Sequence, residues 1–169
     1  QWLNQLPEPL LGYEHYTALL ACAELEDPAA RVRNMALLVQ EASWFAKPLL
    51  VRFVGLLHRC IQPEFATQNN LNVIAVSVLS TPCLLRPYVP ALHATPVSFF
   101  QETEARERMQ MSATATGSTT VEFLIANQGG VLQRLREDLA QREAALSAKC
   151  SRIARLQEST KECVDTMFP

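Results

Sequence analysis

Residues 69–87 read NNLNVIAVSVLSTPCLLRP and contain the most hydrophobic segment of this 169-residue chain. The β-branched residues of this segment would suit a strand, but no partner strand is evident elsewhere in the sequence. The segment is therefore predicted to be a buried helix, which Pro82 should terminate because proline lacks the N–H of a helix interior. The hydroxyl groups of Ser77 and Ser80 are expected to hydrogen-bond to the preceding turn of that helix.

Three amphipathic helices are predicted before this segment. Residues 13–24 form the first, and Asp27-Pro28 gives the second a capping aspartate followed by proline at its first position. Pro48 is predicted to open the third helix, and Pro63 to end it before a polar link at residues 67–70. The apolar positions predicted to face the core are Tyr16, Leu19, Leu20 and Ala23 in the first helix, Val32, Met35, Ala36 and Val39 in the second, and Leu49, Phe53, Leu56, Leu57 and Cys60 in the third.

The sequence changes character after this segment. Four prolines lie within residues 82–96 and a run of small polar residues follows, so residues 86–120 are predicted to be a loop region with a short helix at 101–109. The residues VEFLIAN at 121–127 are predicted to form the last helix of the domain, which Gly129-Gly130 should interrupt. The predicted fold is all-α, with a helical domain over residues 1–127 and a long charged helix over 128–165.

The long charged helix carries an incomplete coiled-coil pattern. Its first heptad seam position holds Leu132, Leu139, Leu146 and Ile153, and its second holds Leu135, Arg142, Lys149 and Leu156. A coiled coil needs both seam positions apolar, so a homo-oligomer formed through residues 131–163 is predicted to be weak. The alternative is a solvated helix that packs one edge on its own domain.

Composition and motif content exclude several classes of function. The 15 basic and 17 acidic side chains lack the basic excess of a nucleic-acid binder, and no apolar run is long enough to span a membrane. Five cysteines without metal-ligand spacing indicate a reducing, cytoplasmic compartment and no metal or cofactor. His15, His58 and His93 lie in different segments and form no catalytic motif. A chain that opens at Gln1 without methionine is expected to be a fragment of a longer protein.

Four segments, in order, resemble the RhoGAP domain, the GTPase-activating domain for Rho-family proteins. WLNQLPEPLL at 2–11 resembles the pattern L-R-x-L-P-x-P-L, and KPLLVRFVGLLHRCI at 47–61 resembles the helix that carries L-x-x-L-x-x-H-L-x-x-V. Residues 69–87 resemble N-K-M followed by N-L-A-x-x-F-x-P-x-L, and VEFLIAN resembles the last helix of the domain. The resemblance covers roughly residues 1–127 and implies a RhoGAP-like helical domain truncated at its amino end.

The resemblance also implies where the functional residues lie. RhoGAP domains insert an arginine finger that neutralises charge on the transferring phosphate, from a loop before L-P-x-P-L, and this sequence is expected to begin after that loop. Asn4 stands at the arginine of L-R-x-L-P, and Ala75 stands at the asparagine of N-L-A. Asn69 and Asn70 stand at the asparagine and lysine of N-K-M. A three-residue slip would instead bring Asn72 to the asparagine of N-L-A.

Three functions stay open from the sequence. The first is a module that binds Rho-family GTPases or other partners without activating them, with Asn4, Asn69, Asn70, Asn72 and Ala75 on its binding surface. The second is a piece of a true activator whose arginine finger lies upstream. The third is a helical scaffold whose tail pairs with another helix. None of the three makes the chain itself an enzyme.

Overall fold

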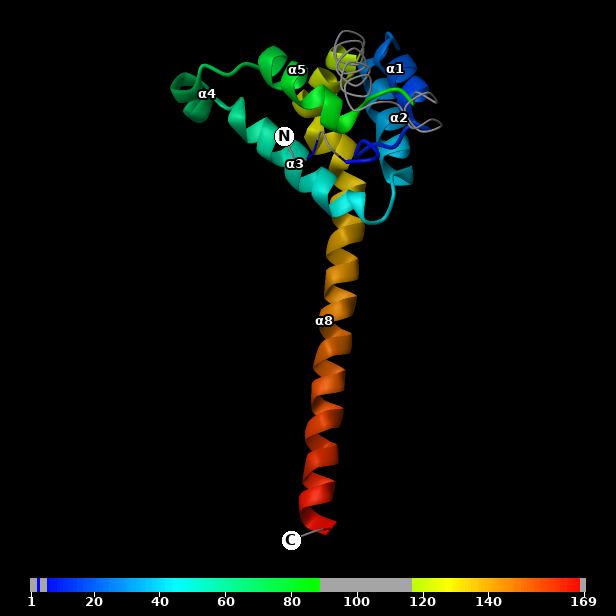
Figure 1. Cartoon of the computed structure of the whole chain (residues 1–169), viewed down its shortest axis with the longest axis vertical. Coiled ribbons are helices and arrows are strands. Elements are labelled where there is room, and N and C mark those ends of the chain that lie inside the picture. Colours follow the sequence, from blue (N-terminus) through cyan, green and yellow to red (C-terminus); the bar gives the residue numbers. More distant parts are fainter. Residues whose placement is uncertain (1–2, 4–5, 89–116, 168–169) are drawn as a thin grey trace, which may run out of the picture. The chain divides into compact units, whose positions relative to one another are not determined.

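The computed structural model describes residue 3, residues 6–88 and residues 117–167, with side chains up to Glu158 (Figure 1). Its helices are α1 (Tyr16–Ala23), α2 (Pro28–Glu41), α3 (Ala46–Cys60), α4 (Pro63–Asn69), α5 (Val73–Leu84) and α8 (Gln128–Met167), and residues 117–126 are helical as well. These described ranges contain no strand, which confirms the all-α prediction. The chain divides into two compact units, residues 1–135 and residues 136–169.

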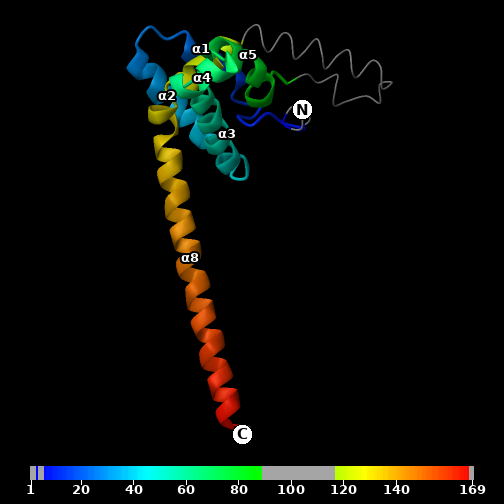
Figure 2. The same cartoon turned by 90° about the vertical axis from the view of Figure 1, so that its left-hand side faces the viewer.

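The core of the first unit is built around residues 117–135, which run alongside both α2 and α3 (Figure 2). Arg31 of α2 places its guanidinium 4.8 Å from the centre of the Phe123 ring. On the other side, Nδ1 of His58 in α3 lies 2.9 Å from the Ile125 carbonyl oxygen. The fully buried side chains of this core include Leu19, Met35, Val39, Leu50, Val54, Leu84, Leu85, Leu124, Ile125, Leu132 and Leu135.

The second helix begins as its sequence predicts. The Asp27 carboxylate accepts hydrogen bonds from the backbone N–H groups of Ala29 and Ala30 at 2.9 and 3.1 Å. Such a cap satisfies N–H groups that have no partner inside the helix and stabilises it by about 1 kcal/mol. Met35 and Val39 are buried as expected, and the predicted aspartate–proline start is confirmed.

Pro63 has the opposite role to the predicted one. It begins α4, and residues 67–69 of the predicted link at 67–70 belong to that helix. Helix α3 already ends at Cys60, before Pro63. Gln62 is extended, with ψ 146°, as a residue before proline prefers, and proline at a first helical position loses no hydrogen bond.

The buried face of α3 is also turned relative to the predicted one. Ala46, Leu50 and Val54 are buried, while Leu56, which was predicted to face the core, is exposed. The residues of α3 are apolar on most of its circumference, so spacing alone does not identify the face that packs.

The hydrophobic segment forms helix α5, as predicted, but Pro82 does not end it. The helix continues to Leu84, and the Leu85 N–H still reaches the Thr81 carbonyl at 2.7 Å. Proline removes only its own hydrogen bond, so a helix can pass through it where packing stabilises the next turn. The predicted back-bonds are confirmed: the hydroxyl of Ser77 donates to Ile74 O at 2.8 Å and that of Ser80 to Val76 O at 2.7 Å.

The carboxyl end of α5 is hydrogen-bonded to residues 10–11, which follow Pro7 and Pro9. The N–H groups of Leu10 and Leu11 donate to the carbonyl oxygens of Cys83 and Leu84 at 3.0 and 3.2 Å. Gly12 then turns the chain with φ 77°, a left-handed conformation that favours glycine. The last carbonyls of a helix have no partner within it, so this segment completes the hydrogen bonding of α5.

The predicted loop at 86–120 is too long at its carboxyl end. Residues 117–120 are helical, while residues 89–116, with the predicted helix at 101–109, lie outside the described residues. A β-carbon at Gly117 would lie 3.1 Å from Thr81 Cγ2, so glycine lets this helix start in close contact with α5. The interruption falls at Asn127, one residue before α8, and α8 runs through Gly129 and Gly130.

In the second unit, residues 136–167 are the remainder of α8, so the predicted long helix is present. Its apolar seam residues Leu146, Ile153 and Leu156 are exposed. No described helix is both long and apolar enough to cross a membrane.

The two glycines at the start of α8 predict opposite effects of the same substitution. Gly129→Ala adds a methyl group with no atom within 4 Å, and it should raise the free energy of unfolding by up to about 1 kcal/mol. Gly130→Ala would place its β-carbon 3.0 Å from Val32 Cγ1, and this contact should cancel the gain or reverse it. Urea denaturation followed by circular dichroism measures both, and equal stabilisation by the two would contradict the packing of α8 on α2.

His58 predicts a second effect on stability. The Ile125 carbonyl can only accept, so Nδ1 carries the proton, and Nε2 accepts from Gln62 Nε2 at 2.9 Å. His58→Leu leaves the carbonyl of a buried residue unpaired and should lower the free energy of unfolding by about 1–3 kcal/mol. His58→Asn keeps a donor near the position of Nδ1 and should lose less. Thermal and urea unfolding of the two variants test this order.

Candidate functional site

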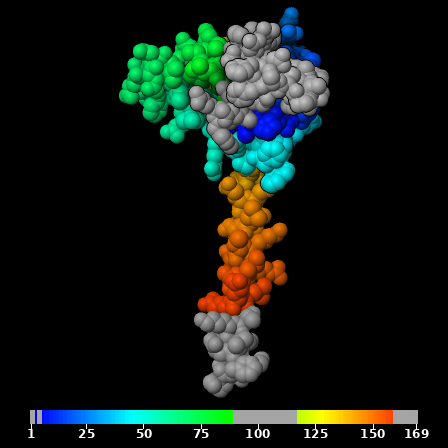
Figure 3. Space-filling view, in the orientation of Figure 1, coloured from blue at the N-terminus to red at the C-terminus, as the bar shows by residue number. Residues whose placement is uncertain are grey.

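Four of the five predicted site residues meet at one corner of the first unit, between α4 and α5 (Figure 1). Asn69 ends α4, Asn70 is its C-cap, Asn72 is the N-cap of α5, and Ala75 lies in the first turn of α5. These four residues are called the α4–α5 corner below. In Figure 3, α4 and the start of α5 (green) project at the edge of the unit. Asn4 lies outside the described residues.

Two of the asparagines have a defined local structural role. Asn70 adopts φ 52° and ψ 27°, the left-handed conformation that asparagine tolerates better than most residues, and it ends α4 there. The side-chain oxygen of Asn72 accepts a hydrogen bond from the Ala75 N–H at 2.8 Å and so caps α5. Ala75 and Asn72, which stand at the asparagine of N-L-A in the two alternative alignments, are therefore joined by a hydrogen bond. Asn69, Asn70 and Asn72 are all exposed.

An exposed apolar stripe continues from this corner along α5. Ile74, Val78 and Leu79 are 59%, 40% and 70% exposed, and half-buried Ala75 lies among them. Positions i, i+1, i+4 and i+5 adjoin one another on a helix, so these four residues form one continuous surface, called the α5 stripe below.

Helix α5 differs from an ordinary surface helix because it is apolar on its outer side as well as on its buried side, where Val76, Cys83 and Leu84 lie. Its buried side contains Ser77, Ser80 and Thr81, whose hydroxyls bond to carbonyls one turn earlier, at 2.7–2.8 Å. Its solvent side carries the larger apolar side chains Ile74 and Leu79. The prediction of a buried helix is therefore wrong for this outer side. A contiguous exposed apolar patch often marks a site where a protein binds another molecule, whereas single exposed apolar residues are ordinary.

The chemistry of this region is that of binding. Amide and aliphatic groups cannot act as acid, base or nucleophile at neutral pH, and the α4–α5 corner and the α5 stripe contain nothing else. Burial raises the pKa of the Cys83 thiol on the inner side of α5, which keeps it protonated and unreactive. No group of His, Cys, Asp and Glu among the described residues could hold a metal ion.

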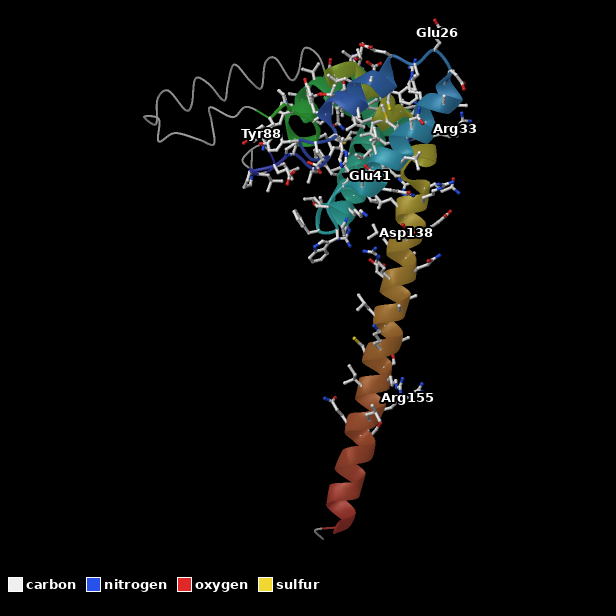
Figure 4. The ribbon with its side chains drawn as sticks, turned by 90° about the vertical axis from the view of Figure 1, so that its right-hand side faces the viewer. Glu26, Arg33, Glu41, Tyr88, Asp138 and Arg155 are labelled. Atoms are coloured by element: carbon white, nitrogen blue, oxygen red, sulfur yellow. The ribbon has the colours of Figure 1, made fainter. Side chains whose placement is uncertain are left out.

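No sequence pattern predicted the role of Arg86. It is buried, its Nη2 donates to the Leu6 carbonyl oxygen, and its guanidinium lies 5.8 Å from the centre of the Tyr13 ring. The Tyr13 hydroxyl donates to Pro7 O at 2.6 Å, and the Tyr13 and Tyr88 rings meet edge to face at 5.4 Å (Figure 4 labels Tyr88). The sequence feature that could have indicated this role is the single charged residue, Arg86, directly after the apolar residues of α5. Arg86 holds the amino-terminal segment against the end of α5.

Comparison with known proteins gives one family match and several relatives, which cover from about half to most of this chain. Residues 1–89, more than half of the chain, match the family model described as "RhoGAP domain". Rat Rho GTPase-activating protein 27 is 32% identical over 89 residues, which cover 51% of this chain and 10% of that protein. Rat unconventional myosin-IXa is 24% identical over 161 residues, 95% of this chain and 6% of that protein. The chain therefore spans a small part of the curated relatives it matches.

Two solved structures share the fold. The BH domain from GRAF, the GTPase regulator associated with focal adhesion kinase, superposes with a TM-score of 0.58 at 23% identity, covering 78% of this chain and 61% of that one. Human Rho GTPase activating protein 15 gives a TM-score of 0.56 at 15% identity, covering 76% and 53%. The ordered sequence landmarks, the helical architecture and the match over residues 1–89 lead to one conclusion: the chain belongs to the RhoGAP domain family.

Proposed function

We propose that this chain is a RhoGAP-like module that binds Rho-family small GTPases through the α4–α5 corner and the α5 stripe, without accelerating GTP hydrolysis. Membership of the RhoGAP family relates the chain to GTPase regulation. One observation supports this particular surface: three exposed asparagines border an exposed apolar helix face. Protein interfaces combine an apolar centre with polar groups at the rim in this way.

The absence of activation is proposed from residues inside the chain. Ala75 stands where the family has the asparagine of N-L-A, and its methyl group offers no hydrogen bond. Asn4 stands where the family has an arginine, so that position carries no positive charge. The arginine finger of the family, which accelerates hydrolysis by about a thousandfold or more, is a separate residue, so the proposal rests on the hydrogen bond missing at Ala75 and the charge missing at Asn4.

The two other readings keep specific support. A fragment of a genuine activator would retain the same binding surface and gain its activity from a finger upstream. A scaffold with a self-associating tail is supported by exposed Leu146, Ile153 and Leu156 on one side of α8. A cytoplasmic location is proposed from the free thiols of the described cysteines Cys22, Cys60, Cys83 and Cys150.

Binding and catalysis separate in one pair of assays. The immobilised chain should retain a GTP-loaded Rho-family GTPase, while single-turnover hydrolysis by that GTPase should rise by no more than a few-fold. Ile74→Ser with Leu79→Ser removes the exposed apolar centre and should weaken binding by about tenfold or more. Leu37→Ser on α2, which is 52% exposed, is the matched control and should bind as the wild type does.

Two results would contradict the proposal. Strong stimulation of hydrolysis by this chain would favour the activator reading, since the residues present would then suffice for catalysis. Equal binding by the stripe variant and the Leu37 variant would place the GTPase elsewhere. Circular dichroism of each variant checks that the helices are retained.

The tail predicts a separate result. The wild-type chain should sediment mainly as a monomer, because Arg142 and Lys149 interrupt the second seam position of α8. Arg142→Leu with Lys149→Leu restores an apolar seam and should shift the chain to a dimer over the same concentration range. Sedimentation velocity of both proteins measures this shift, and a tight wild-type dimer would refute the weak-association prediction.

A further inference from the structure

The solvent face of α3 is a second exposed surface, with a different chemistry. The exposed positions of α3 are Pro48, Arg52, Leu56 and Arg59, and exposed Trp44 and Phe45 lie in the turn before the helix. From Phe45 onward these positions follow one another at intervals of three or four residues, so they share one side of the helix. This set of six residues is called the α3 face below. It lies opposite the buried Leu50 and Val54.

The charge on this part of the chain has one sign. Residues 42–63 contain Lys47, Arg52 and Arg59 and no aspartate or glutamate, in a chain whose net charge is -2. Within the part of the chain that the structure describes, no carboxylate forms an ion pair with Arg52 or Arg59. The preceding carboxylate, Glu41, lies 3.9 Å from His15 Nδ1 and belongs to α2 (Figure 4).

The aromatic pair projects at the start of this face. Trp44 is 75% exposed and Phe45 64%, and their rings meet edge to face at 6.2 Å between centres. Two adjacent aromatic side chains so exposed lose much of the free energy that burial would give them. Tryptophan and phenylalanine gain from entering the headgroup region of a bilayer, where the apolar body of the ring leaves water.

We propose that the α3 face binds the surface of an anionic membrane, with Trp44 and Phe45 entering the headgroup layer and Arg52 and Arg59 contacting lipid phosphates. A helix with cations and large apolar side chains on the same exposed side is suited to lie in the plane of such a surface. The face runs for about 21 Å and contains no amide or hydroxyl side chain. Its side-chain hydrogen-bonding groups are all donors, namely the guanidinium groups of Arg52 and Arg59 and the indole N–H of Trp44, which suits the acceptor oxygens of lipid phosphates.

The test is vesicle co-sedimentation of the 169-residue chain. Phosphatidylcholine vesicles containing phosphatidylserine should retain the chain, pure phosphatidylcholine vesicles should not, and retention should fall as salt rises. Arg52→Gln and Arg59→Gln should each weaken binding about fivefold, and Trp44→Ser with Phe45→Ser should abolish it. All four positions are exposed, so these substitutions should leave the fold intact, which circular dichroism checks.

Matched controls lie on α2. Arg33→Gln removes an exposed arginine and Leu37→Ser an exposed leucine, and both variants should bind vesicles as the wild type does. Trp2→Phe leaves Trp44 as the single tryptophan, and its emission should shift to the blue when phosphatidylserine vesicles are added. An unshifted emission would show that the ring stays in water and would overturn the proposal.

Further outcomes would overturn it as well. The wild-type chain could fail to bind phosphatidylserine vesicles, or it could bind pure phosphatidylcholine vesicles equally well. The α2 control variants could also lose as much vesicle binding as the α3 variants. If the Arg52 and Arg59 variants lose GTPase binding while no variant binds vesicles, the α3 face serves an acidic protein partner instead. The Ile74→Ser, Leu79→Ser variant should keep its vesicle binding, so that failure of lipid binding and failure of GTPase binding are distinguishable.

Discussion

Two backbone hydrogen bonds join the amino-terminal segment of the first unit to the carboxyl end of α5, from the N–H groups of Leu10 and Leu11 to the carbonyl oxygens of Cys83 and Leu84. The last carbonyls of a helix have no partner within it, and here they lie among buried leucines, where an unpaired carbonyl would cost about 1–3 kcal/mol. Pro7 and Pro9 cannot donate, so the segment that contains them forms no helix of its own and its two leucine N–H groups remain available for α5. The segment with Pro7 and Pro9 and the helix end with Pro82, which are far apart in the sequence, are thus joined directly by hydrogen bonds.

This arrangement explains why α5 can expose apolar residues. Its carboxyl end is fixed by the segment at residues 10–11 and by the close approach of Gly117, and its inner hydroxyls bond within the helix. The position of α5 therefore does not depend on burying Ile74 or Leu79, which are both exposed. Sequence hydrophobicity alone indicates burial of the whole helix. Because the hydroxyls of Ser77, Ser80 and Thr81 bond to backbone carbonyls of their own helix, these residues can lie on its buried side, and large aliphatic groups remain on its outer side.

The parts of the fold that the sequence predicts correctly are those governed by local chemistry. Asp27-Pro28 caps a helix wherever it occurs, and the back-bonds of Ser77 and Ser80 need only their own helix. Pro63 and Pro82 were misassigned because a proline can open a helix or lie within one, and tertiary packing decides which. The exposed corner was predicted from a family resemblance, whereas the structural role of Arg86 depends on Leu6 and Tyr13, which are distant in sequence.

The two exposed surfaces differ in the kind of partner that their chemistry can hold. The α5 stripe is aliphatic, carries no charge and is bordered by amides, so its free energy of binding must come from shape and burial against another apolar surface. The α3 face carries two arginines and two aromatic rings, so it can gain from a phosphate-rich surface without a matching shape. The two sets share no residue, so substitutions can remove one proposed surface and leave the side chains of the other unchanged.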